Sequence, residues 1–362
     1  MARVDAFNKG KFNKDDEYYT RYEDIQTELN HYEDYFKGKT VLCNCDDPFE
    51  SAFCKFFLKN FNYFGLKRLI CTSYGTSPMI GTQLSLFDEL DEPVVAGNGY
   101  VMDISEIPMA NGRGISDDDI NKLLKSKKRG VKKLKGDGDF RSLECIEYLK
   151  QADIVCTNPP FSLFREYLAQ LMEYNKDFLI IGRETSITYK DTFDYIKNNK
   201  AWYGYSHAKV FMRPDGTVKA FGNVGWFTNM DVAKRHEELI LYRQYSPEAY
   251  PNYYNYDGID IKNITDIPQD YDGMMGVPLS FLFSWNPDQF ELIGMGQSVP
   301  KKILHKTAGD EIHFIDAVTD DILYRVPYTV PERKRGNQLR IDENGKPGRV
   351  PFGRLIIRKK VK

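Results

Sequence analysis

Short apolar runs alternate with amphipathic segments through the first two thirds of the chain. Runs typical of strands lie at 40–43, 66–72, 154–157, 178–181, 201–205, 209–212 and 222–228. Apolar residues at helical spacing lie at 15–36, 49–57, 140–148 and 163–172. Strands that alternate with helices are typical of an α/β sheet with helices packed on its faces. We therefore expect an α/β fold in this part of the chain.

One of these strands ends in a stiff turn. The run at 154–157 predicts a buried strand, and Pro159 and Pro160 end it because neither can donate a ladder hydrogen bond. Each proline fixes its own φ and restricts the residue before it, so the Asn158 side chain is held in place before any ligand arrives. In an open α/β sheet such a turn lies at the carboxyl ends of the strands, where ligands bind.

The turn contains Asn158, Pro159, Pro160 and Phe161, which resemble the tetrad of amino-methyltransferases. An amine such as adenine N6 is a poor nucleophile because its lone pair is delocalised into the ring. The Asn158 side-chain oxygen and the Pro159 carbonyl could accept both amine hydrogens and favour a pyramidal nitrogen. Phe161 would stack on a base taken out of the helix. The alternative is a proline-terminated strand with an aromatic plug.

Composition and charge narrow the classes of protein. The 362 residues, 41% of them hydrophobic, suit two domains or one enlarged domain. The formal net charge is -2, so nucleic-acid binding would depend on local basic patches. Six cysteines without a CxxC pair or a nearby histidine cluster predict reduced thiols of a cytoplasmic protein and no metal site. We find no signal peptide and no apolar run that could cross a bilayer, so no membrane partner is expected.

Two turns that follow strands carry candidate ligand-binding residues. After the run at 40–43, Asp46 and Asp47 have alternative roles: Asp47 can cap the next helix, with Pro48 at its first position, and the other carboxylate could bind the amino acid end of a cofactor. The glycine-rich fingerprint of nucleotide-binding turns is absent. At the end of the run at 66–72, Thr72, Ser73 and Tyr74 stand where many such folds place an acid that binds ribose, which leaves the ribose-binding residue open.

Two basic segments are candidates for DNA contact. In an insertion at 75–136 they are Lys127, Lys128, Arg129, Lys132 and Lys133. From Arg325 onward the chain contains twelve basic residues and only three acidic ones, and Arg333, Lys334 and Arg335 are consecutive. A charged strand at 354–361 would also suit a DNA backbone. The alternatives are a solvated loop and a solubilising tail.

Several segments resemble, in order, the EcoRI-type adenine-specific DNA methyltransferases: 16–20, 43–48, 138–142, 157–166, 222–228 and 276–278. The resemblance implies a γ-class N6-adenine methyltransferase with a Rossmann-like fold and a mixed seven-stranded sheet. It implies S-adenosylmethionine as the methyl donor and double-stranded DNA as the substrate. It also implies that the cofactor is bound by Tyr19, Thr20, Asn44, Asp46, Asp47, Asp139, Phe140 and Asn158.

The expected domains follow from the same resemblance and the change in composition. We expect a flexible N-terminus at 1–14, a catalytic domain at 15–230 and a C-terminal target-recognition region at 231–362. The protein would be a monomer in the cytoplasm of a bacterium, encoded by the bacterium or by a phage, and a cognate restriction endonuclease is a candidate partner. Two alternatives are a methyltransferase of RNA or of protein glutamine, and a catalytically silent DNA-binding module on the same fold.

Overall fold

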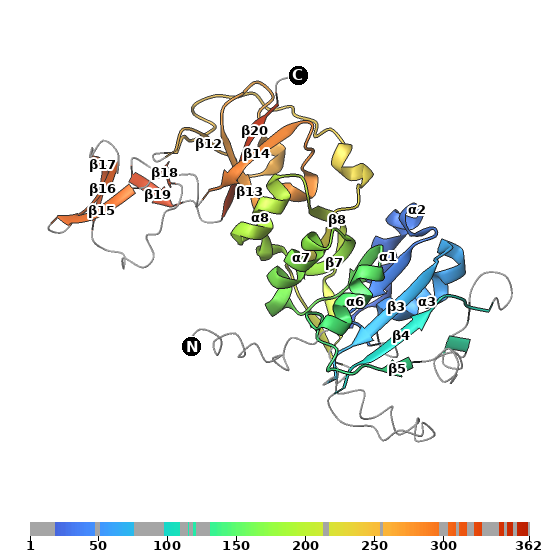
Figure 1. Ribbon diagram of the computed structural model, residues 1–362. Coiled ribbons are helices and arrows are strands. Elements are labelled where there is room, and N and C mark those ends of the chain that lie inside the picture. The colour runs from blue at the N-terminus through green and yellow to red at the C-terminus, as the bar shows by residue number, and fades with distance from the viewer. Residues whose placement is uncertain are drawn as a thin grey trace. The chain divides into compact units, whose positions relative to one another are not determined.

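The computed structural model describes residues 19–47, 51–75, 98–108, 115, 119–120, 131–212, 217–253, 256–296 and 353–360, and five strands between 303 and 349. The chain divides into two compact units, 1–232 and 233–362 (Figure 1). The N-terminal segment 1–14 and six of the expected DNA-contacting residues lie outside the described residues: Lys127, Lys128, Arg129, Arg333, Lys334 and Arg335.

The first unit is built on a mixed sheet of eight strands. Their order is β5 (Val131–Lys133), β4 (Tyr100–Ile104), β3 (Arg68–Ser73), β2 (Thr40–Cys43), β6 (Ile154–Thr157), β7 (Asp177–Arg183), β11 (Val224–Thr228) and β8 (Trp202–His207). The four central strands, β3, β2, β6 and β7, are parallel, whereas β4, β5, β11 and β8 are added by antiparallel pairing.

The α/β class was predicted correctly, but the count of seven strands was wrong. Two strands, β4 and β5, arise within the expected insertion at 75–136 and extend the sheet beyond β3. The strand-like run at 209–212 does not join this sheet, because its residues pair with a separate small sheet. Both differences come from pairings between distant segments, which the apolar pattern of one segment does not specify.

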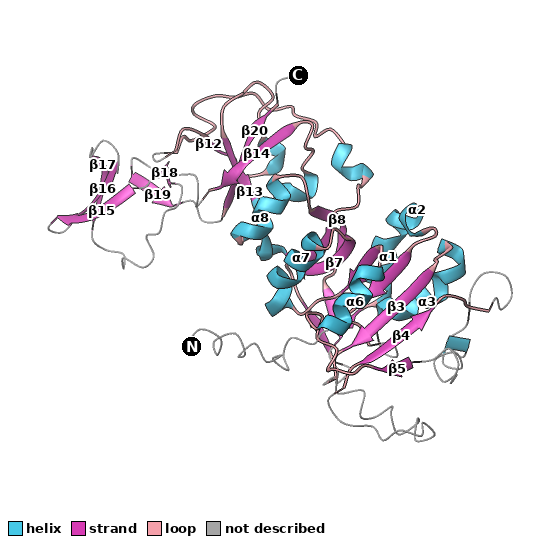
Figure 2. Cartoon of the chain, viewed as in Figure 1, coloured by secondary structure: helices cyan, strands magenta, loops and turns pink. Residues whose placement is uncertain are grey.

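Helices cover both faces of the sheet (Figure 2). On one face α1 (Tyr22–Leu29) packs on α3 (Ala52–Phe64), with α2 (Glu33–Phe36) beside α3. On the other face α6 (Leu143–Gln151) packs on β2 and α7 (Phe164–Glu173) packs on β7, with α8 (Lys190–Lys197) against α7. Short 3-10 helices in this unit span Asn30–Tyr32, Phe161–Leu163 and Glu184–Thr188. The carboxyl ends of the parallel strands are thus left to loops.

The segment expected to begin one long helix near residue 15 instead contains a strand. Residues Tyr19–Thr20 form β1, which pairs antiparallel with β9 (Val210–Met212), and β9 pairs with β10 (Val218–Ala220). Helix α1 then begins at Tyr22. The expectation was wrong because the aromatic spacing from residue 18 onward fits a helix, whereas the partner strand of β1 lies far along the chain.

The second unit has its own sheet, in the order β12 (Ile259–Asp260), β13 (Met275–Pro278), β20 (Arg354–Lys359) and β14 (Phe290–Met295). A three-stranded sheet follows, with β15 (Ile303–Ala308), β16 (Glu311–Asp316) and β17 (Ile322–Pro327), and a hairpin of β18 (Arg340–Glu343) and β19 (Lys346–Arg349). Short 3-10 helices span Ala233–His236, Ile264–Asp266 and Leu279–Ser284.

Strand β20 was expected to be a packed strand that bears positive charge suited to a DNA backbone. The packed strand is confirmed, but Arg354 does not present its charge at the surface. Arg354 is buried and donates to the buried carboxylate of Asp260 at 2.8 Å, because a buried guanidinium requires a partner of opposite charge. Two further cations of β20 form ion pairs, the exposed Arg358 with Glu291 at 2.7 Å and the half-buried Lys359 with Asp272 at 3.2 Å. The charge of Arg354 is therefore neutralised inside this unit.

Candidate active site

A pocket opens at the carboxyl ends of β2, β3 and β6, with a volume of about 860 Å³ that includes its open mouth. From β2 the chain continues to β3 on one side, whereas β6 lies on the other side, so the direction of winding reverses here. Such switch points leave a crevice in which ligands bind. All eight residues expected at the cofactor line the pocket: Tyr19, Thr20, Asn44, Asp46, Asp47, Asp139, Phe140 and Asn158.

The pocket also contains residues that the sequence pattern did not identify. Cys45, Ser51, Ala52, Phe53 and Gly138 line it beside the expected residues. Ser73, the last residue of β3, and Tyr74, which follows it, line the pocket as well. Their position at the end of β3 was the sequence signal that could have identified them as ligand-binding residues. Neither is the acidic residue that many related folds have at this position.

The Asp46 carboxylate connects the loop after β2 with the end of β6. It is 6% exposed and accepts hydrogen bonds from the Ser51 hydroxyl, at 2.6 Å, and from the Thr157 hydroxyl. The backbone N–H of Asn158 also donates to it. In addition, the backbone N–H of Asp46 donates to the Thr72 carbonyl at the end of β3. One buried side chain thus holds the first residue of the tetrad against the loop after β2.

Burial raises the pKa of Asp46 to about 8, and the neighbouring Cys54 thiol acts in the same direction. The hydrogen bonds from Ser51, Thr157 and Asn158 oppose this shift, because they favour the charged carboxylate. The folded chain therefore holds a proton on Asp46 at pH values where the unfolded chain has released it. The stability that this proton provides is complete below about pH 4 and falls as pH rises to about 8.

We expect Asp46→Asn to remove this dependence on pH. The parent should lose stability relative to the variant as pH rises, and the difference in free energy of unfolding should change by on the order of 3 kcal/mol between about pH 5 and 8. Urea denaturation of both proteins at several pH values measures this difference. A difference that stays constant over the range would contradict the buried, protonated state of Asp46.

Helix α3 begins later than the sequence suggested. Its N-cap is Ser51, whose hydroxyl oxygen accepts from the Phe53 N–H at 3.1 Å while its proton is donated to Asp46. The expectation that Asp47 caps this helix was therefore wrong. Asp47 is buried and lines the pocket instead. A hydroxyl can cap the helix and donate at the same time, whereas a carboxylate can only accept.

Some buried polar atoms of the pocket lining, among them Asn44 Nδ2 and the Thr20 hydroxyl, have no hydrogen-bond partner among the described residues. Asn44 accepts from the Tyr167 hydroxyl through its side-chain oxygen, but its Nδ2 makes no hydrogen bond. The hydroxyl of Thr20, on β1, is likewise without a partner. Buried polar groups are nearly always hydrogen-bonded, so each such atom needs an explanation. A polar ligand in the pocket would supply the missing partners.

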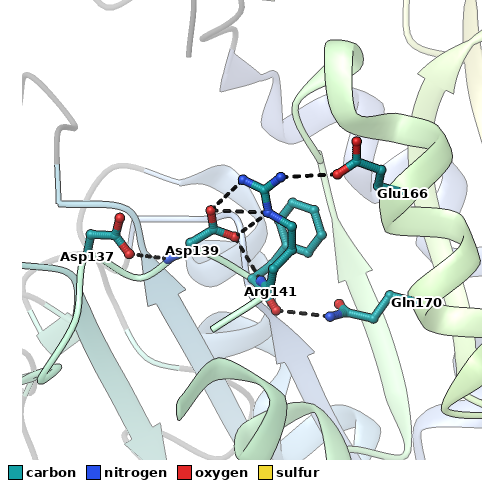
Figure 3. A network of polar contacts seen from close by, with 6 residues as sticks. Asp137, Asp139, Arg141, Glu166 and Gln170 are labelled. Carbon is teal, nitrogen blue, oxygen red and sulfur yellow. Dashed lines mark hydrogen bonds and ion pairs between the residues drawn. The ribbon is translucent and has the colours of Figure 1, made fainter. Parts of the chain in front are cut away.

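Asp139 lies in a network of polar contacts before α6 (Figure 3). Arg141 donates to both oxygens of Asp139, at 2.7 Å in the ion pair, and its other terminal nitrogen reaches Glu166 at 3.1 Å. Burial raises the pKa of Asp139, but the hydrogen bonds from Arg141 outweigh it and the net pKa is lowered. Asp139 is therefore an ionised acceptor at the pocket wall.

Phe140 is the aromatic wall of the same part of the pocket. Its ring is 3% exposed and meets the Tyr167 ring edge-on, with centroids 5.0 Å apart. Gln170, on α7, donates to the Phe140 carbonyl at 3.2 Å. The contacts from α7, which follows the tetrad, thus position the ring that precedes α6.

The tetrad divides between the pocket and an aromatic cluster. Asn158 and Pro160 line the pocket, and Pro159 is buried. Phe161 does not line the pocket; its ring lies edge-on to Phe211 and Phe221, at 6.2 Å from each. Two of the four expected catalytic residues therefore line the pocket, whereas the ring of Phe161 packs against two other aromatic rings.

Of the expected DNA-contacting residues, Lys132 and Lys133 are described. Both lie on β5, the edge strand of the large sheet, where Lys132 is exposed and Lys133 is half-buried. Among the residues that the structure describes, no three His, Cys, Asp or Glu side chains gather as they would around a metal ion. In the same part of the chain, no helix has the length and apolar character needed to span a bilayer.

The comparisons with family models and with curated proteins indicate the same family. The family model "Adenine-specific methyltransferase EcoRI" matches residues 6–360. The type II methyltransferase M.EcoRI of Escherichia coli is 43% identical over 317 residues, 82% of this chain and 91% of its own length. M.MgeORF184P of Mycoplasma genitalium is 35% identical, over 79% of this chain and 85% of its own. M.MpnI of Mycoplasma pneumoniae is 34% identical, over 79% of this chain and 84% of its own length. No solved structure matches.

Proposed function

This chain belongs to the EcoRI family of adenine-specific DNA methyltransferases. From that premise we propose one function for its pocket and another for its tetrad. The pocket at β2, β3 and β6 binds S-adenosylmethionine. The tetrad presents N6 of an adenine that has been taken out of double-stranded DNA. The observation that carries this proposal is that one buried carboxylate, Asp46, joins the pocket loop to the backbone of Asn158.

The residues of the pocket fit the proposed cofactor. The unpartnered Asn44 Nδ2 and Thr20 hydroxyl can bond to polar groups of the cofactor, and the ionised Asp139 can accept from its exocyclic amine. Phe140 can flank the adenine ring, and Tyr19 provides a further aromatic wall. When bound, S-adenosylmethionine supplies a methyl group on a cationic sulfonium, which aromatic rings favour. Ser73 and Tyr74 are the pocket residues nearest in the chain to the end of β3 and are our candidates for the ribose.

The tetrad then acts by positioning. The Asn158 side-chain oxygen and the Pro159 carbonyl accept the two hydrogens of the adenine amine, which favours a nitrogen whose lone pair is available. Asp46 holds the Asn158 backbone, so the acceptor does not have to reorganise when the base arrives. Phe161 stacks on the extruded base. No residue in this arrangement has to act as a strong base.

We assign the two units separate tasks. The sheet order β3, β2, β6, β7, with β11 antiparallel to β7, supports a Rossmann-like methyltransferase core that β4 and β5 extend. The catalytic domain is 15–230 and the target-recognition region is 231–362. We further propose a monomer that acts on double-stranded DNA in the bacterial cytoplasm, as part of a restriction-modification system with a cognate endonuclease.

Two measurements test this proposal. Calorimetric titration with S-adenosylmethionine should give binding to the purified chain, and absence of binding would favour a silent DNA-binding module. DNA from a methylation-free host that expresses the chain should contain N6-methyladenine at one sequence motif, found by sequencing that reports modified adenines. Unmodified DNA, together with methylated RNA or protein glutamine, would contradict the choice of substrate.

Duplex affinity should depend strongly on salt. The net charge of -2 provides no global attraction, so binding must come from local cations such as Lys132 and Lys133 and from the basic segments near Lys127 and Arg333. Each phosphate contact releases counterions, and affinity should fall at least roughly tenfold between about 50 and 200 mM salt. Fluorescence anisotropy with a labelled duplex measures it, and a flat response would contradict phosphate contacts by these segments.

A further inference from the structure

Three phenylalanine rings gather where the tetrad leaves the pocket. Phe161 meets both Phe211, on β9, and Phe221, just after β10, at 6.2 Å, and the latter two rings are 5.4 Å apart. All three pairs are close to perpendicular, the arrangement that aromatic rings prefer when they pack edge to face. Phe211 is fully buried, whereas Phe161 and Phe221 are half-buried. We call these three residues the ring cluster.

One cation lies over each of the two half-buried rings of the ring cluster. The Arg183 guanidinium is 5.5 Å from the centre of the Phe161 ring, and Lys219 Nζ is 4.9 Å from the centre of the Phe221 ring. Arg183 comes from the carboxyl end of β7 and is exposed. The cations therefore come from two different sheets, Arg183 from the large sheet and Lys219 from β10 of the small one, and each lies on a ring of the cluster that contains Phe161.

Arg183 makes no ion pair with any other residue that the structure describes, although a carboxylate follows it in the chain. That carboxylate, Glu184, contacts the His207 ring at 2.9 Å instead. Arg165 is an arginine that also lies over an aromatic ring, but its charge is neutralised by a carboxylate. It lies 5.0 Å from the centre of the Tyr189 ring but also forms an ion pair with Asp191 at 2.7 Å. The charge of Arg183 is thus available to an anionic ligand.

We propose that Arg183 and Lys219, held on the ring cluster, bind the DNA phosphates on either side of the target adenine. This inference rests on the proposed function, because the stacking of Phe161 on the extruded base would bring that nucleotide's own backbone to these two cations. A guanidinium matches a phosphate through two parallel hydrogen bonds, and an ammonium contacts it as a point charge. The rings hold both side chains by cation–π contact, so the phosphate site is formed before DNA arrives.

The first test compares Arg183→Ala and Lys219→Ala with the parent and with Arg165→Ala as the matched control. The probe is a duplex oligonucleotide that carries the motif mapped by sequencing of modified adenines. Each of the first two variants should weaken binding roughly tenfold and reduce the slope of log affinity against log salt by about one. Arg165→Ala should match the parent, because Asp191 already neutralises that cation. Calorimetric affinity for S-adenosylmethionine should be unchanged in all three variants.

The second test locates the contact on the DNA. Neutral methylphosphonates replace, one at a time, the phosphates next to the target adenine. Such a replacement should weaken binding of the parent roughly tenfold, but it should have little further effect on Arg183→Ala or Lys219→Ala if the variant has already lost that contact. A replacement that weakens the variants as much as the parent would overturn the inference.

The outcomes separate this inference from the proposed function. If the parent methylates its motif and binds with a steep salt dependence, but Arg183→Ala and Lys219→Ala keep the parent's slope and affinity, the phosphate site is wrong and the proposed function stands. If the parent neither methylates DNA nor binds the duplex, the proposed function fails, and this inference fails with it.

Discussion

Asn158→Ala should reduce methyl transfer to DNA at least roughly a hundredfold while the affinity for S-adenosylmethionine changes by less than about tenfold. The substitution removes one of the two acceptors proposed for the adenine amine, and removal of one preorganised polar group in an active site costs about this much. The cofactor keeps its other proposed contacts, which come from β1, from the loop after β2 and from the segment before α6. Incorporation of radiolabelled methyl groups into duplex DNA measures the first quantity, and calorimetric titration measures the second.

Two variants of the same turn serve as controls. Asn158→Asp keeps a side-chain oxygen acceptor of nearly the same size, so it should retain measurable activity. Ser162→Ala changes an exposed residue next to the tetrad and should leave activity near that of the parent. Full activity of Asn158→Ala would remove the role that we assign to this side chain. A parallel loss of cofactor binding would instead make Asn158 mainly a cofactor-binding residue.

Gly138→Ala should weaken the binding of S-adenosylmethionine at least roughly tenfold, and activity at low cofactor concentration should fall with it. Gly138 has a φ of +81°, which L side chains rarely adopt, and an added Cβ would lie 2.1 Å from the carbonyl oxygen of Ser73. The methyl group meets backbone, so the segment that carries Asp139 and Phe140 must move away from the end of β3. Both residues line the pocket, and their displacement changes the proposed adenine site.

The matched control is Gly136→Ala, two residues earlier. A Cβ at Gly136 would meet nothing within 4 Å, and its N–H, which donates to Glu144, is kept in alanine. This variant should bind the cofactor like the parent, as measured by calorimetric titration, and thermal unfolding should confirm that both variants are folded. Equal cofactor affinity in Gly138→Ala and Gly136→Ala would contradict the close approach of Gly138 to β3 as a requirement for the pocket.

Local patterns in the sequence were sufficient for the strands that form the centre of the sheet. The runs at 40–43 and 154–157 coincide with β2 and β6, because each has three consecutive apolar residues and is followed by residues that end a strand. The residues expected at the cofactor also gather at one pocket. The proximity of Asn44, Asp46, Asp47 and Asn158 follows from the parallel pairing of β2 and β6, which places the turns after both strands at one edge, whereas the other four residues come from β1 and from the segment before α6.

Local patterns failed where a distant segment changed the outcome. The aromatic spacing that predicted a long N-terminal helix fits the helical period, yet Tyr19 and Thr20 pair with β9, which no local pattern indicates. The N-cap of α3 was also predicted wrongly from local pattern. Ser51 caps this helix in place of Asp47, because its hydroxyl can accept from the helix and also donate to Asp46. In both cases a contact made only in the folded chain outweighed a weak local preference.

By itself, the amino-acid sequence determined the α/β class, the central strands and the proline turn that carries the tetrad, because these depend on the period of apolar residues and on the stiffness of proline. Only the tertiary structure decided which charges remain available. Arg354, expected to face DNA, is neutralised by Asp260, whereas Arg183, which no motif singled out, lies without an ion pair to any described residue over the ring of Phe161. The partners of a charged side chain come from other segments, so its net charge in the folded protein is a property of packing.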